Sequence, residues 1–122
     1  MTTIKTFREL EVWKKAHAMV LRIYRITSSF SKSELFGLTS QLRRSAAAVP
    51  ANIVEGFRRK SLKDSLNFYN IADASLEETK YHLLLAFDLH YISETQYAKE
   101  KDFTEQVGRL LTRWIQSQRQ YI

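Results

Sequence analysis

The sequence predicts an all-α protein, an up-and-down antiparallel four-helix bundle. Its 122 residues include only three glycines and one proline, whereas a β-sandwich or barrel needs a turn about every 8–12 residues. Four capping-box patterns, in which Ser or Thr is followed three residues later by an acid or Gln, are nearly evenly spaced, and each precedes an amphipathic stretch. We therefore expect helices over residues 8–28, 32–58, 62–90 and 94–119, in a single domain that spans residues 1–122.

The first helix, over residues 8–28, is predicted to start at the pair Thr6 and Glu9. Apolar residues then recur at alternating steps of four and three: Val12, Ala16, Met19, Ile23, Ile26 and Phe30. A second apolar stripe lies beside them: Leu10, Trp13, Val20 and Tyr24. Because one narrow core contact does not need so wide an apolar face, Val12, Met19 and Ile23 are candidates for contact with a second copy of the chain. A broad core contact within one subunit is the alternative.

The second helix, over residues 32–58, is predicted to begin at Ser31 and Glu34, and it holds the only proline, Pro50. Proline has no N–H to donate to the Ala46 carbonyl, and its ring crowds that turn of the helix. We therefore expect helix two to bend at Pro50, with helix on both sides.

Polar residues after the proline are interpreted as structural. Asn52 and Glu55 lie where the interrupted helix leaves backbone groups in need of partners, so their side chains are expected to repair the backbone. Gly56 offers a position at which the helix can end.

The last two helices are predicted to begin at Ser61 with Asp64 and at Ser93 with Gln96. The final segment again carries two adjacent apolar stripes, formed by Phe103, Val107, Leu110, Leu111, Trp114 and Ile115. Both end helices of the bundle are therefore broadly apolar.

The composition, 44% hydrophobic and 26% charged, is typical of a globular domain that buries its own core. The absence of cysteine excludes disulfides, thiolate catalysis and every Cys-ligated metal site. The first eight residues lack the apolar stretch of a secretory signal, and the longest apolar run, residues 83–87, is far shorter than the roughly 20 residues of a membrane span. We expect a cytoplasmic protein without membrane association.

Charge is distributed unevenly along the chain. Residues 1–60 hold twelve Lys or Arg against four Asp or Glu, whereas residues 61–122 hold seven against nine. The sequence pI is near 9.7. A basic half of this kind favours a polyanionic partner, most simply nucleic acid, although solvated helix faces rich in Lys give the same count.

The common catalytic and cofactor patterns are missing. The three glycines are too far apart for a phosphate-binding loop or a dinucleotide fingerprint. Glu78 and His82 are one residue too widely spaced for a di-iron Glu-x-x-His motif, and His17, His82 and His90 form no cluster of metal ligands. The Arg that helical ribonucleases of the HEPN type place shortly before a His is also missing. We expect neither an enzyme nor a cofactor.

The remaining candidates for a binding role are cations near helix ends: Arg43, Arg44, Arg58, Arg59, Lys60 and Lys63. The last four lie where the second helix ends and the third begins, so they are expected to converge on one corner of the bundle. Arg contacts phosphate through two N–H groups and Lys as a point charge. Compensation of the helix dipole, which contributes from a few tenths to about 1 kcal/mol, is the alternative role.

Four segments carry a family resemblance: residues 7–16 (FRELEVWKKA), 34–45 (ELFGLTSQLRRS), 49–56 (VPANIVEG) and 71–78 (IADASLEE). Together they resemble the four-helix bundle proteins of 23S rRNA intervening sequences, over most of the chain. Two residues depart from the family pattern: Ser31 replaces a usual Pro and Ala74 a usual Gly. Ser31 makes the start of helix two less rigid than a Pro would, and Ala74 adds a methyl group to a contact between helices. Neither substitution alters the basic residues.

The resemblance implies an antiparallel four-helix bundle that assembles into a ring, typically a homopentamer. It also implies similarity to the accessory proteins of diversity-generating retroelements, which form basic pentameric barrels that bind nucleic acid and a reverse transcriptase. The leading hypothesis is therefore a non-enzymatic homo-oligomer that binds nucleic acid, RNA more than DNA. The alternative is a structural or adaptor ring that binds a partner protein such as a reverse transcriptase.

Overall fold

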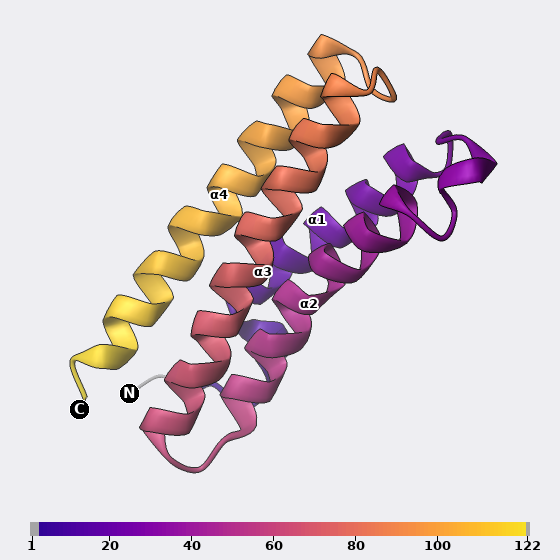
Figure 1. Ribbon diagram of the computed structural model, residues 1–122. Helices are drawn as coiled ribbons and strands as arrows, with labels where there is room; N and C mark the ends of the chain where they lie inside the picture. Colours follow the sequence, from indigo (N-terminus) through magenta and orange to yellow (C-terminus); the bar gives the residue numbers. More distant parts are fainter. Residues whose placement is uncertain (1–2, 122) are drawn as a thin grey trace.

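The computed structural model describes residues 3–121 and confirms an all-α bundle of four helices (Figure 1). The helices are α1 (Glu11–Thr27), α2 (Leu38–Arg58), α3 (Leu62–Asp88) and α4 (Glu94–Arg119). Two 3₁₀ turns precede the first two helices, η1 (Phe7–Glu9) and η2 (Lys32–Glu34). Successive helices run in opposite directions, and residues 3–121 contain no strand. None of the helices in this range combines the length and the hydropathy of a membrane span.

The first two helices begin later than predicted because their capping patterns form 3₁₀ turns. Glu9 accepts a hydrogen bond from the Thr6 N–H at 2.8 Å, but the chain extends at Leu10 before α1 begins. Before α2, Glu34 reaches past its own turn and accepts from the N–H of Leu38, the first residue of the helix, at 3.1 Å. That hydrogen bond, the largest cause, lowers the pKa of Glu34.

The starts of α3 and α4 agree with the prediction. The Ser61 hydroxyl accepts from the Asp64 N–H at 3.1 Å, and the Ser93 hydroxyl accepts from the Gln96 N–H at the same distance. The third helix ends two residues earlier than predicted, close to His90, whose φ of 64° lies in the left-handed region.

Helix α2 continues through Pro50, so the prediction of helix on both sides is confirmed. The side chain of Asn52 donates to the Ala48 carbonyl at 2.8 Å, which confirms its structural role. Glu55 does not bind the backbone as predicted but pairs with Arg59 one turn later. The bend at Pro50 stays a prediction.

Gly56 lies inside α2 and does not end it, contrary to the prediction. A Cβ atom at this position would lie 2.5 Å from Cε1 of Tyr69 and 3.0 Å from the Ser65 carbonyl oxygen. The missing side chain therefore lets α2 and α3 approach closely next to their connecting turn, which is why glycine is needed in mid-helix despite its cost in helix propensity.

The three residues predicted to contact a second copy lie in the core of the single chain. The exposed fractions of Val12, Met19 and Ile23 are 4%, 1% and 0%. They share that core with side chains from all four helices, among them Leu42, Leu76 and Leu111. Their assignment to an oligomer contact is corrected, because the helices of the same chain already cover the stripe that they form.

A buried polar cluster joins the middle of α2 to α3. The Thr79 hydroxyl donates to the Ser45 hydroxyl at 3.0 Å, and Nδ1 of His82 lies 3.4 Å from the same oxygen. Glu78 lies on the other side of His82, 3.8 Å from Nε2, and also pairs with Arg44. Burial, the largest cause, lowers the pKa of His82 below its ordinary value, and the charge of Arg44 acts in the same direction against that of Glu78.

This lowered pKa predicts a stability that depends on pH. Below the ordinary pKa of histidine, about 6.5, the unfolded chain binds a proton that folded His82 resists, so the free energy of unfolding falls as the pH drops toward the folded pKa. Urea titrations between neutral pH and about pH 5 measure this loss. The variant His82→Gln should lose less stability over that range, and an equal loss in both proteins would contradict the prediction.

Candidate nucleic-acid interface

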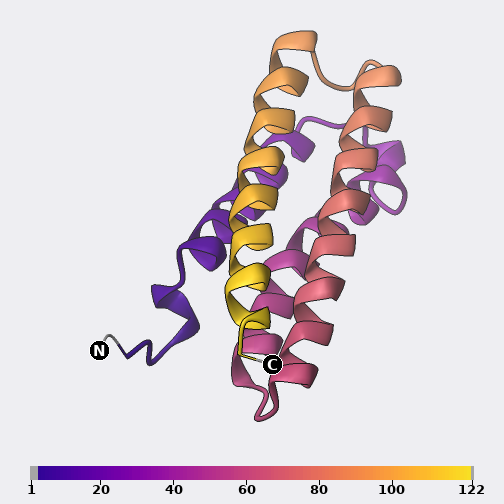
Figure 2. The same cartoon turned by 90° about the vertical axis from the view of Figure 1, so that its left-hand side faces the viewer.

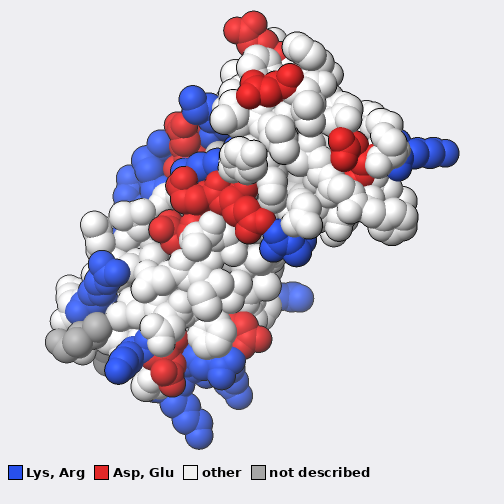
Figure 3. All heavy atoms as spheres, viewed as in Figure 1, with Lys and Arg blue, Asp and Glu red and all other residues white. Residues whose placement is uncertain are grey.

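The six predicted cations lie at two separate places. Arg43 and Arg44 are in the first half of α2, fifteen residues before its end, which corresponds to about 22 Å along the helix axis. The other four surround the turn between α2 and α3, and we call this group the basic corner: Arg58, Arg59, Lys60 and Lys63. Cationic side chains protrude at this end of the molecule (Figure 3). Of these four, Arg59 and Lys60 line a common hollow, whereas Arg43 and Arg44 stand apart from the corner.

Arg43 and Arg44 are both occupied by acceptors of their own chain. Nε of Arg43 donates to the Thr27 hydroxyl at 2.8 Å, and its guanidinium lies 4.5 Å from the centre of the Tyr24 ring. Arg44 donates to Gln41 and pairs with Glu78 on α3. These two residues tie α2 to its neighbours, and the structure gives them a packing role in addition to their charge.

The basic corner is more open. Arg59 pairs with Glu55 and lies 4.4 Å over the Phe68 ring, while Arg58, Lys60 and Lys63 are exposed. A hollow of about 320 Å³, which we call the corner hollow, opens beside them. Its lining combines cations with hydroxyl, amide and aromatic groups, among them Arg59, Lys60, Ser65, Tyr69, Trp114 and Gln118. The N-terminal end of α3 lies at the same place and adds partial positive charge.

A larger basic surface, absent from the sequence prediction, lies between α1 and α4. Figure 2 shows α1 inclined to α4, with its first turns displaced to one side. The space between them is a hollow of about 670 Å³, which we call the α1–α4 groove. Four cations line it, Lys14, Lys15, Arg109 and Arg113, against a single carboxylate, Glu11.

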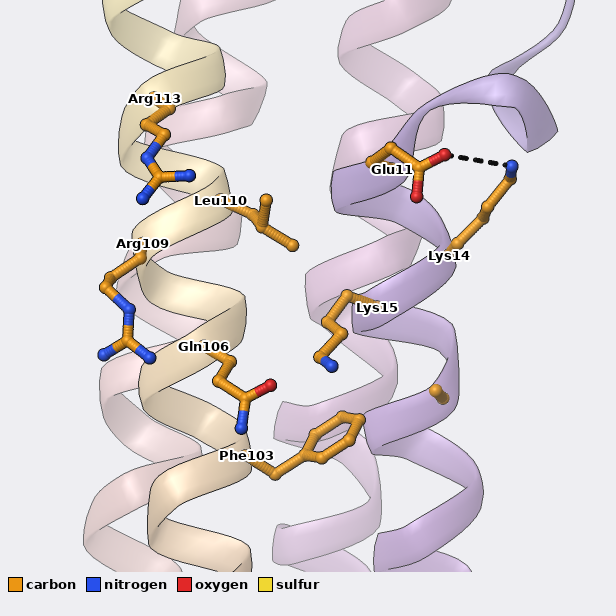
Figure 4. A pocket seen from close by; sticks show the side chains of 9 residues that line it. Glu11, Lys14, Lys15, Phe103, Gln106, Arg109, Leu110 and Arg113 are labelled. Carbon is orange, nitrogen blue, oxygen red and sulfur yellow. Dashed lines mark hydrogen bonds and ion pairs between the residues drawn. The ribbon is translucent and has the colours of Figure 1, made fainter.

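Figure 4 shows how these side chains lie in the α1–α4 groove. Nζ of Lys14 is 3.2 Å from the Glu11 carboxylate, so this acid is already paired. Lys15 points from α1 toward Phe103 on α4, with its Nζ 4.6 Å from the ring centre. Arg109 and Arg113 project from successive turns of α4 at the outer edge of the groove, on the side of the helix away from Lys15. The lining carries a net charge of +3, which suits a polyanion rather than a neutral ligand.

The opposite flank of α4 is mixed in charge. A hollow of about 460 Å³ between α3 and α4 is lined by three carboxylates, Asp73, Glu77 and Glu105, and by a cation of α3, Lys80. It shares Arg109 and Arg113 with the α1–α4 groove. Acidic side chains gather over the middle of this face (Figure 3). Together with Lys80 the two arginines balance the three carboxylates, so this hollow carries no net charge, whereas the lining of the α1–α4 groove is positive.

The comparisons with known proteins agree with this fold. A model of the 23S rRNA-intervening sequence protein family matches residues 8–113. The chain belongs to this family. The family resemblance of the sequence is thereby confirmed. A search among curated proteins finds no match.

A solved structure of the same kind comes from Bacteroides thetaiotaomicron VPI-5482. It is described as a protein with unknown function from the S23 ribosomal protein family. The two chains are 28% identical and superpose with a TM-score of 0.79, over 86% of this chain and 95% of the other. The architecture of this intervening-sequence protein is therefore shared with its relative at almost full length.

Proposed function

We propose that this member of the 23S rRNA-intervening sequence protein family is a non-enzymatic nucleic-acid-binding protein of the cytoplasm, with RNA as the preferred ligand. The observation that carries the proposal is the α1–α4 groove, whose lining holds four cations and one carboxylate that is already paired. Neutralising phosphates releases their counterions, and this supplies affinity without reading sequence. The reference to rRNA in the family name supports RNA over DNA.

We further propose that the protein acts as a homo-oligomer, a pentamer by its resemblance to ring-forming relatives. Apolar side chains outside the core support this step. Phe36, in the connection before α2, is 92% exposed, and Leu21, Tyr24 and Leu35 are each about half exposed. These residues replace Val12, Met19 and Ile23 as candidates for subunit contact, and in a ring each weak phosphate contact is repeated, which raises avidity.

The exposed Phe36 also favours a second candidate function, an adaptor ring that binds a partner protein such as a reverse transcriptase. An aromatic side chain at a loop tip is a common anchor in protein interfaces. Similarity to the accessory proteins of diversity-generating retroelements would fit this role. The two candidates differ in an observable way, because the adaptor alone predicts no binding of nucleic acid even at low salt.

Replacing Arg58, Arg59 and Lys60 together with Ser tests the basic corner. If the corner contacts phosphates, binding to structured RNA should weaken for all sequences, and the slope of log affinity against log salt should flatten by up to about 3. Gel shifts over a salt series measure both quantities. Because the three side chains are exposed, the melting temperature should change little.

The matched control replaces Lys32, Lys99 and Lys101 with Ser, which removes the same charge from exposed positions elsewhere. Equal weakening by both triple variants would show that net charge, not the corner, determines affinity. Unchanged affinity with a stability loss of about 1 kcal/mol would assign the corner to dipole compensation. Failure of the unaltered protein to bind any nucleic acid at low salt would reject the proposed function.

A further inference from the structure

The α1–α4 groove and the corner hollow are linked by a neighbouring hollow that shares lining residues with both. A third hollow, of about 390 Å³, lies between them. It shares Glu11, Leu110 and Arg113 with the α1–α4 groove. It shares Ile4 and Trp114 with the corner hollow. The three hollows therefore follow α4 from Phe103 to Gln118, and we call this path the α4 track.

The chemistry of the α4 track changes along its length. Its first part is cationic, with Lys14, Lys15, Arg109 and Arg113. Its middle is mainly apolar, and two carboxylates, Glu9 and Glu11, lie at this part of the lining, so it suits bases better than phosphates. The apolar lining residues are Ile4, Leu10, Val12, Leu110 and Trp114. Its last part is cationic again, with Arg59 and Lys60. The fifteen steps from Phe103 to Gln118 correspond to about 22 Å of helix, enough for several nucleotides.

We propose that the α4 track holds an extended single strand of nucleic acid, and this inference rests on the proposed function. Proteins that bind single strands combine a basic groove along the phosphates with aromatic and apolar surfaces for the bases. Here the two basic parts would hold phosphates, and the middle would receive one or more bases against Trp114 and Leu110. The hollow on the α3 side of α4 has as many carboxylates as cations, so net positive charge attracts the strand only on the α1 side of α4.

A duplex fits this surface less well. The bases of a duplex are stacked inside it, and its outer surface presents phosphates. The charged phosphates would then lie against the apolar middle of the α4 track, which offers them no partner. Phe103 does not serve as a stacking platform, because Lys15 and Arg22 both lie within 5 Å of its ring centre, at 4.6 and 4.5 Å. Bases are therefore directed to the middle of the track.

The test compares two double variants of the same helix. Arg109→Ser with Arg113→Ser removes two cations of the α4 track, and Lys99→Ser with Lys101→Ser removes equal charge from exposed positions of α4 outside it. The probe is a labelled oligouridine of about 12 nucleotides, and a hairpin of equal phosphate count serves as the duplex. We expect the first variant to lose about tenfold or more in affinity for the oligouridine, and the second less than about threefold.

Trp114 supplies an independent readout. The variant Trp13→Phe leaves Trp114 as the only tryptophan of the chain, and its fluorescence should change when oligouridine binds. Melting curves establish that each variant is folded. Trp114 fluorescence that does not change at saturating oligouridine would overturn the inference.

The other outcomes separate the inference from the proposed function. Equal losses in the two double variants, or equal affinity for hairpin and oligouridine, would overturn the single-strand path while nucleic-acid binding stands. Binding of polyglutamate at the track without competition by oligouridine would assign it to an acidic peptide and overturn the inference. Absence of binding to either nucleic acid at low salt would overturn both.

Discussion

Replacing Ile23 with Glu is expected to prevent folding of the single chain, and not merely to dissociate an oligomer. Ile23 is fully buried among core side chains from all four helices. The variant loses the burial of a large apolar side chain and places a carboxyl group where the core offers it no partner. The combined cost, more than about 5 kcal/mol, is comparable with the whole stability of a small domain. Far-ultraviolet circular dichroism and urea titration measure the loss.

The matched control is Leu21→Glu, on the same helix but with a side chain that is 51% exposed. This change should alter stability by about 0.5 kcal/mol or less. If Leu21 takes part in subunit contact, the control should also shift the molar mass measured by light scattering. A folded Ile23→Glu variant of reduced molar mass would instead restore the original assignment of Ile23 to an interface.

Replacing Glu100 with Ala is expected to destabilise the protein by about 3 kcal/mol. Arg22 on α1 binds this carboxylate through two N–H groups, at 2.7 and 3.1 Å. The Glu100 side chain is 9% exposed and that of Arg22 is 30% exposed. Removing the acid leaves a largely covered guanidinium without its charged partner, which is the costly way to break such a pair. The partial exposure of Arg22 places the expected value at the lower end for buried pairs.

The ion pair between Glu11 and Lys14 provides the comparison. Both of its side chains are more than half exposed, so Glu11→Ala should cost less than about 0.5 kcal/mol. The double variant Arg22→Met with Glu100→Leu should recover much of the stability lost in Glu100→Ala, because it removes both charges together. Similar losses for the exposed and the covered pair in urea titrations would show that burial does not determine the cost of breaking them.

The number, type and order of the helices could be predicted from the sequence because periodicity and capping are local signals. The starts of α1 and α2 could not, since a Ser or Thr followed by an acid caps a single 3₁₀ turn as well as a helix. Glu34 does cap α2, but it lies before the helix. Its carboxylate accepts a hydrogen bond from the N–H of Leu38, four residues later in the chain.

Periodicity also fails to say which partner covers an apolar stripe. It groups Val12, Met19 and Ile23 correctly on one face, but the same spacing serves a core or an interface.

The α1–α4 groove could not be predicted from the sequence for a different reason. Lys15 and Arg109 lie at opposite ends of the sequence, and the arginines belong to the half of the chain with net negative charge. Only the i, i+4 spacing of Arg109 and Arg113 on one helix could have indicated a shared basic face.

The pairing of the first helix with the last has a consequence for the order of folding. Arg22 and Glu100 are 78 residues apart in the chain, whereas α2 and α3 are joined by a short turn and meet closely at Gly56. Contacts between neighbours in sequence close small loops and form early, so the α2–α3 hairpin should assemble first and the α1–α4 contact last. The same contact is then the easiest to open from the native state, while the hairpin stays intact. The groove therefore lies at the helix contact that we expect to open first.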